Sequence, residues 1–139
     1  MHIAYLAVAA AACLIMALIE AWLLLGRVSA KDGPLARLVP NTKDLLSSHI
    51  DYLMMALFLF VFYGLFRVMG VAPPDWLVAA ACFGSFFNPF GFLLRAVKPA
   101  YQQAPPKIFM TFMTISCMAT TASFSAAGWM IAAAAMGAP

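Results

Sequence analysis

Four long apolar blocks, separated by short segments that carry charges and prolines, account for most of this 139-residue sequence. The blocks run over residues 3–25, 45–66, 76–94 and 108–136. A helix needs roughly 20 apolar residues to cross the hydrocarbon core of a bilayer, and lipid offers no hydrogen-bond partner to an irregular backbone. The sequence therefore predicts an all-α membrane protein. Residues 1–139 should form a single domain, an up-and-down bundle of four transmembrane helices.

Charge and cysteine content narrow the possible functions. Only 9% of the residues are charged, against about 25% in an ordinary soluble domain, so a separate soluble catalytic module is not expected. The net charge of +3 needs no nucleic-acid partner, because loop cations beside anionic lipid headgroups account for it. Cys13, Cys82 and Cys117 lie inside apolar blocks without a CxxC pattern. We interpret them as packing residues, with neither a disulfide framework nor covalent haem attachment.

The cations are distributed unevenly between the two ends of the predicted bundle. Seven of the eight lie between the first and second blocks or between the third and fourth, whereas Arg67 alone flanks the short link between the second and third. The positive-inside rule places the seven on the cytoplasmic side and both termini on the other. We therefore expect a multi-pass protein of a bacterial-type inner (plasma) membrane. The first block has no basic leader and is expected to be a retained helix.

Prolines mark several helix ends and one interior position. Pro40-Asn41-Thr42 and Pro73-Pro74-Asp75 predict N-caps for the second and third helices. Pro89 lies inside the third block, where it should kink the helix and free a backbone carbonyl one turn back, close to Ser85.

Polar side chains of all four blocks fall at one depth. Each lies six to eight residues inward from a loop cation, roughly 10 Å at 1.5 Å per residue. They are Glu20, His49, Asp51, Asn88 and Thr114. Polar groups are costly in lipid, so their convergence at one level predicts a buried site. His49 and Asp51 point about 200° apart on one helix and cannot serve the same monomeric site, which favours an oligomer with its site near a subunit boundary.

Each of these residues also has a purely structural interpretation. His49 can serve only as a hydrogen-bonding side chain, Glu20 can be protonated or paired with a loop cation, and Asn88 can satisfy the backbone beside Pro89. The many Met and Phe residues are more often packing than a cofactor site. The small residues at 120–128 suit close contact between helices.

Two motifs carry a resemblance to a known family. Through Ser48-His49 followed by Met54-Met55, and through Asn88-Pro89-Phe90-Gly91-Phe92, the chain resembles the styrene oxide isomerases over its second and third blocks. The resemblance implies a trimer that holds haem b between protomers, with His49 as the ligand of the iron. It also implies an isomerase that converts the epoxide of a small hydrophobic substrate to a carbonyl compound.

The resemblance also assigns residues around the cofactor. A substrate-flanking asparagine and tyrosine of the family correspond to Met55 and Phe92 here, which would contact the cofactor. Polar contacts to the substrate would then come from Asp51, Tyr52 and Asn88 as catalytic residues. The charge distribution of the family suggests cytoplasmic termini, opposite to the orientation that the cations of this chain predict.

Two alternatives stay open. The segment Ser48-His49-Ile50-Asp51-Tyr52-Leu53-Met54 is similar to a second-helix motif of the trimeric membrane enzymes of glutathione and eicosanoid metabolism, keeping its histidine and lacking its glutamate. This similarity implies a glutathione-dependent transferase or isomerase, which would need arginines for the glutathione carboxylates. The other alternative is a non-enzymatic accessory subunit that packs against a larger membrane complex through its fourth helix.

Overall fold

Four long helices form the body of the protein. The computed structural model describes residues 2–30 and 33–137, and these residues form no β-strand. The long helices are α1 (Ala4–Ser29), α3 (Thr42–Met69), α4 (Asp75–Val97) and α6 (Lys107–Ala135), and the short ones are α2 (Pro34–Leu38) and α5 (Ala100–Gln103). All four long helices are long and apolar enough to cross a membrane. The predicted four-helix fold is confirmed. Six of the eight helix ends lie one to four residues beyond the predicted spans, while α1 begins and α6 ends one residue inside them.

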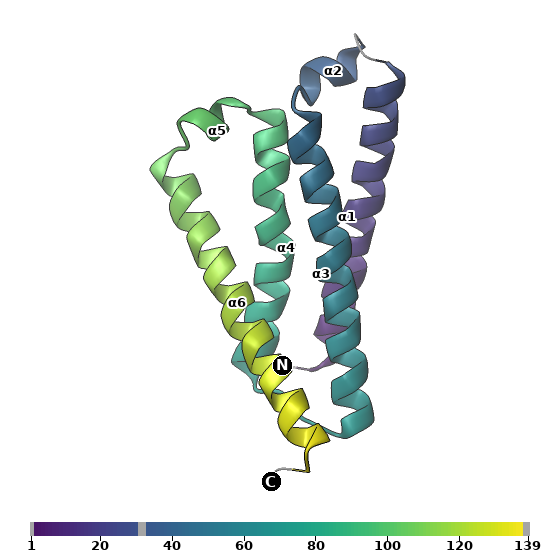
Figure 1. Ribbon diagram of the computed structural model, residues 1–139, viewed down its shortest axis with the longest axis vertical. Coiled ribbons are helices and arrows are strands. Elements are labelled where there is room, and N and C mark those ends of the chain that lie inside the picture. Colours follow the sequence, from purple (N-terminus) through teal and green to yellow (C-terminus); the bar gives the residue numbers. More distant parts are fainter. Residues whose placement is uncertain (1, 31–32, 138–139) are drawn as a thin grey trace.

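The helices form two antiparallel pairs (Figure 1). Helix α1 packs along α3, α6 packs along α4, and the contact between α3 and α4 joins the pairs. The short helices α2 and α5 lie together at one end of the bundle, and the two termini lie at the other. The pairs are connected by a short turn at Gly70, whose φ of 67° is a left-handed conformation that glycine adopts without steric cost.

The long helices begin as their sequences allow. Asn41 caps α3, since its side-chain oxygen accepts a hydrogen bond from the backbone N–H of Asp44 at 3.2 Å. This confirms the cap predicted at Pro40-Asn41-Thr42. The side-chain cap predicted at 73–75 is wrong, because the capping position is Pro74, which has no side-chain acceptor, and Asp75 is already the first helical residue.

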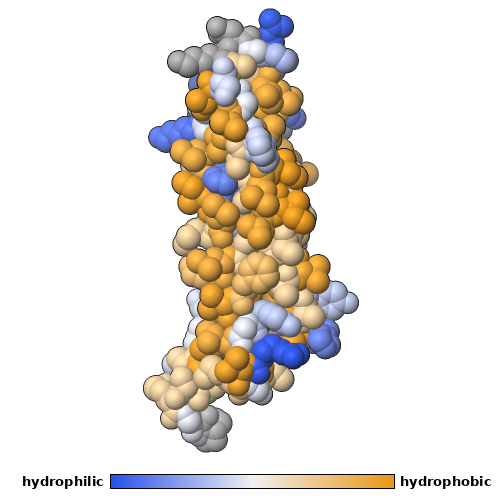
Figure 2. Space-filling view, turned by 90° about the vertical axis from the view of Figure 1, so that its right-hand side faces the viewer, coloured by the Kyte–Doolittle hydropathy of each residue, from blue (hydrophilic) through white to orange (hydrophobic). Residues whose placement is uncertain are grey.

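Apolar side chains cover the outside of the bundle. Figure 2 shows them over the middle of one face, with hydrophilic side chains gathered toward the two ends. Large apolar residues are exposed on every long helix, among them Val8, Trp22, Leu57, Trp76 and Trp129. A soluble protein seldom exposes such continuous apolar surface, whereas a bilayer requires it. The surface therefore agrees with a multi-pass membrane protein. Assembly into a trimer stays a prediction.

The two helices of the second pair approach each other most closely at glycines. A β-carbon built at Gly84 would collide with the side chain and backbone of Thr120, and one at Gly91 would collide with Met113. Small residues at such crossings let two backbones come together, which is the main source of helix attraction where lipid removes the hydrophobic driving force. Position 84 therefore sets the spacing between α4 and α6.

Candidate functional site

A buried polar cluster joins α1, α3 and α4. Glu20 and Ser48 are both fully buried, and the Ser48 hydroxyl donates to Glu20 Oε1 at 2.7 Å. The same hydroxyl lies 3.0 Å from the backbone carbonyl oxygen of Pro89. Glu20 therefore reaches across to the middle of α4 through Ser48. Of the polar side chains predicted to converge at one depth, only Glu20 belongs to this cluster, and Ser48 is a member that the depth argument did not include.

Pro89 explains why α4 offers polar groups at this point. Proline has no N–H, so the carbonyl of Ser85, one turn earlier, loses its usual helical partner. The Cys13 thiol approaches that carbonyl at 3.6 Å, a long contact. This agrees with the predicted free carbonyl near Ser85. In the described part of the chain, Glu20 Oε2 and the Ser85 hydroxyl are buried without a hydrogen-bond partner. Two polar atoms inside the bundle thus retain unused bonding capacity.

Tyr52 and Met55 lie in the core beside this cluster. The Tyr52 side chain is fully buried, its hydroxyl donates to the Phe86 carbonyl at 3.0 Å, and its ring meets the Phe86 ring edge-on at 6.0 Å between centroids. Met55 is 8% exposed. Within one protomer, Tyr52 is therefore held between α3 and α4 by its own hydrogen bond.

His49 lies on the side of α3 that contacts α1. Its Nδ1 atom is 2.8 Å from the carbonyl oxygen of Ala17, and the side chain is only partly buried. A carbonyl can only accept, so Nδ1 carries the hydrogen of this bond and Nε2 keeps a free lone pair. The exposed side chains of Leu46 and Leu53 share this face of α3, one turn before and one turn after His49.

Asp51, Asn88 and Phe92 lie away from His49. Asp51 is half-buried and shares a helix face with Phe58, whose ring contacts Phe124 of α6. Asn88 Oδ1 accepts a hydrogen bond from the Cys117 thiol of α6 at 2.9 Å.

Phe92 lies at the basic end, where the Arg95 guanidinium stands over its ring at 5.4 Å. One protomer thus places the predicted site residues in two regions, with His49 toward α1 and the others toward α6 or in the core. The structure accordingly keeps the imidazole and the polar catalytic candidates on different sides of α3.

An ion-pair network closes the end of the bundle that carries the loops. The Arg95 guanidinium donates to Asp44 Oδ1 at 3.2 Å, and Asp44 also accepts from Gln102 at 3.0 Å and from Asn41 at 2.8 Å. Asp44 is almost fully buried. The network ties α3 to α4 and α5. Sequence reasoning did not find it, because its members lie far apart in the chain and outside the apolar spans.

The described residues contain no group of three or more histidine, cysteine, aspartate or glutamate side chains that could hold a metal ion. A lone histidine suits a metal centre whose remaining ligands come from a cofactor. Comparisons with protein-family models, curated proteins and solved structures find no match.

Proposed function

We propose that this chain is a membrane-embedded haem b protein in which the His49 imidazole is the axial ligand of the iron. The observation that carries the proposal is the 2.8 Å contact between His49 Nδ1 and the Ala17 carbonyl oxygen. Metal-binding histidines almost always donate their second ring N–H to a carbonyl or carboxylate, which fixes the tautomer and orients the ring. His49 has this arrangement, with Nε2 free to bind.

The surroundings of His49 are compatible with a flat, mostly apolar macrocycle. A groove of about 530 Å³ lies between α1 and α3, one turn from His49, and its walls include Leu24, Leu25, Val28 and Leu46. Lys43 lines the same groove, six residues from His49 or about 9 Å along the helix axis. The leucines and valine offer apolar contact, and the lysine offers a cation for a haem carboxylate.

The position of His49 on the outer side of the helix pair also supports an oligomer. One protomer covers a single side of the imidazole, so a second copy packed over this face would enclose the cofactor. A homotrimer, as the resemblance to the styrene oxide isomerases implies, would provide that enclosure. It could also bring Asp51 or Asn88 of a neighbouring copy toward His49 of the first.

In this proposal the reaction is the isomerisation of a small hydrophobic epoxide to a carbonyl compound. His49 would hold the haem, and the bound iron would supply a Lewis acid for the epoxide oxygen. The chain supplies the imidazole, the apolar surroundings that exclude water, and hydrogen-bonding groups of Asp51 and Asn88 that can orient the substrate. Tyr52 and Met55 act from the core by fixing the position of α3. We further propose cytoplasmic loops and non-cytoplasmic termini in a bacterial-type inner membrane, from the distribution of cations.

An absorption spectrum tests the proposal directly. The wild-type protein, purified in detergent and supplied with haemin, should acquire a Soret band whose intensity corresponds to one haem per His49. The position of this band should shift on reduction. His49→Ala should lose the band. The matched control is His2→Ala, because His2 is the only other histidine and lies exposed at the start of α1. Equal haem content in wild type and His49→Ala would refute the proposal.

Activity separates the enzyme from a haem carrier. We expect the haem-loaded protein to convert an aryl epoxide such as styrene oxide to its aldehyde without a redox partner, and His49→Ala to lose this turnover. The glutathione-dependent alternative predicts turnover that needs the thiol and no pigment. It would also need several arginines for the glutathione carboxylates, and Arg27 already donates to the Val39 carbonyl at 3.3 Å.

A further inference from the structure

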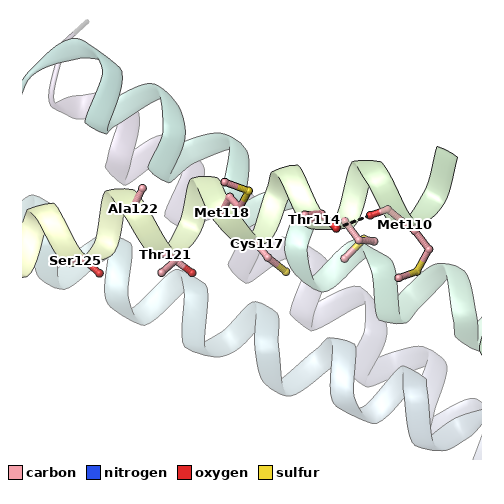
Figure 3. Close-up of a pocket in the computed structure, with 8 residues that line it drawn as sticks. Met110, Thr114, Cys117, Met118, Thr121, Ala122 and Ser125 are labelled. Carbon is pink, nitrogen blue, oxygen red and sulfur yellow. Dashed lines mark hydrogen bonds between the residues drawn. The ribbon is translucent and has the colours of Figure 1, made fainter. Parts of the chain in front are cut away.

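A second groove runs along α6 and shares no lining residue with the groove between α1 and α3. Its main part has a volume of about 610 Å³ and follows α6 from Met110 to Ser125. Cys117, Thr121 and Ser125 point to the same side of the helix along it (Figure 3). The fifteen residues between its ends span about 22 Å, whereas one leaflet contributes roughly half of a 30 Å hydrocarbon core. The groove is therefore long enough for an acyl chain that spans its leaflet.

A smaller cavity adjoins the groove at the basic end of the bundle. This cavity of about 160 Å³ lies between α4 and α6 and is lined by Gly91, Phe92, Arg95 and Phe109 together with Met110 and Met113. The two methionines also line the long groove, so the two hollows share a wall. Methionine is flexible and fits irregular apolar ligands. A single elongated molecule could thus occupy both, with one end at Arg95.

Arg95 has bonding capacity left at that end. Its guanidinium donates one hydrogen bond to Asp44, yet Nε is buried and has no hydrogen-bond partner among the described residues. The side chain is 31% exposed, so other guanidinium hydrogens remain accessible. A guanidinium favours phosphate as a ligand, so the exposed N–H groups of Arg95 can bind an anion at this end of the groove.

The charge of this region favours an anion, and the groove favours a lipid. The segment 91–113 contains Arg95, Lys98 and Lys107 and no acidic residue. A soluble anion would leave the apolar groove unfilled. A second copy of this chain would have to present a carboxylate to Arg95. Of the four acidic residues in the described part, Asp75 lies at the opposite end of the bundle, Asp44 is already paired and Glu20 is fully buried. Asp51 lies seven residues beyond Asp44 on α3, about 10 Å further into the span and away from the level of the basic end.

We infer that this groove binds an anionic phospholipid of the leaflet beside the basic loops, with the phosphate at Arg95 and one acyl chain along α6. The site uses neither His49 nor the groove between α1 and α3. It therefore stands or falls independently of haem binding.

Native mass spectrometry of the full-length protein in detergent, with phosphatidylglycerol and phosphatidylcholine of identical acyl chains, tests the inference. Both lipids carry the phosphate, but the choline of phosphatidylcholine adds a cation beside Arg95, Lys98 and Lys107. We therefore expect about tenfold tighter retention of phosphatidylglycerol, equivalent to about 1.4 kcal/mol. Arg95→Gln should abolish this preference, while Arg67→Gln, at the other end of the bundle, should keep it. His49→Ala should also keep it.

Arg95→Gln removes the cation that pairs with Asp44 and can impair folding. A second pair of variants therefore leaves this ion pair intact. Thr114→Trp fills the groove next to Met110, whereas Ile115→Trp places the same side chain on an exposed position of α6 outside it. The first should lose bound lipid and the second should retain it. Equal retention of both lipids by the wild type would overturn the inference, as would full retention by Thr114→Trp. Displacement of the lipid by glycerol phosphate alone would indicate a site for free anions instead. If Thr114→Trp changed the number of subunits and left the bound lipid unchanged, the occupant of the groove would be a second copy of the chain.

Discussion

Substitution of Gly84 by alanine should weaken the contact between α4 and α6. An added β-carbon would meet the Thr120 hydroxyl, the Thr120 backbone nitrogen at 2.7 Å and its Cα at 3.0 Å. The hydroxyl can rotate away, but the backbone atoms cannot, so the helices must separate locally. Overpacking of this kind costs about 1–3 kcal/mol, and alanine recovers about 1 kcal/mol through its higher helix propensity. The net loss relative to the wild type is then up to about 2 kcal/mol, and about 1–3 kcal/mol relative to an alanine substitution that gains the propensity without the collision.

Equilibrium unfolding measures this effect, by titration of the protein in dodecyl maltoside with SDS while helicity is followed by circular dichroism. Gly64→Ala is the matched control, because Gly64 is also in the middle of a long helix and nothing lies within 4 Å of its added β-carbon. The control should be unchanged or stabilised by up to about 1 kcal/mol. Thr120→Ala in the Gly84→Ala background should restore only part of the loss, since the Thr120 amide remains. If Gly84→Ala were as stable as Gly64→Ala, the close approach of α4 and α6 at this point would be wrong.

Two further substitutions probe the polar contacts with the same unfolding measurement. Ser48→Ala should cost about 1–3 kcal/mol, because it leaves both oxygens of the buried Glu20 without a partner. Ser47→Ala removes only a bond to its own helix and should cost less than about 0.5 kcal/mol, so equal losses would contradict a role for Ser48. Asp44→Asn keeps the shape of the side chain but removes its charge. We expect a loss of about 1–3 kcal/mol and easier proteolysis between α5 and α6, and an unchanged stability would show that Asp44 does not hold the loop end together.

The sequence alone was sufficient for the four spans and their antiparallel order. Apolar length and the positions of charges determine where a chain enters and leaves the hydrocarbon, and neither depends on distant contacts. The Asn41 cap was predictable for the same reason, since its bond to Asp44 is local. The motif at 73–75 shows the limit of this reasoning. Its capping residue type, Asp75, is already the first helical residue and comes one position after the N-cap, Pro74.

The lateral contacts of the site could not be predicted so well. Depth follows from counting residues along a helix, and it brought Glu20 to the correct level. Which side chain Glu20 meets depends on the rotation of α1 and α3 against each other, and that rotation is set by packing over the whole length. Ser48 was present in the sequence beside His49, but nothing local distinguished it from Ser47. Cys117, interpreted as a packing residue, instead lies exposed on α6 and donates to Asn88.

The division of the bundle into two helix pairs bears on how the protein is made. Each pair returns to the side from which it entered, so the first can be laid down in the bilayer before the ribosome has finished the second. Ser48 and Glu20 belong to the first pair, whereas the Pro89 and Phe86 carbonyls belong to the second. The Glu20 carboxyl therefore remains only partly covered until α4 is inserted, and docking of the two helix pairs is the step that buries it.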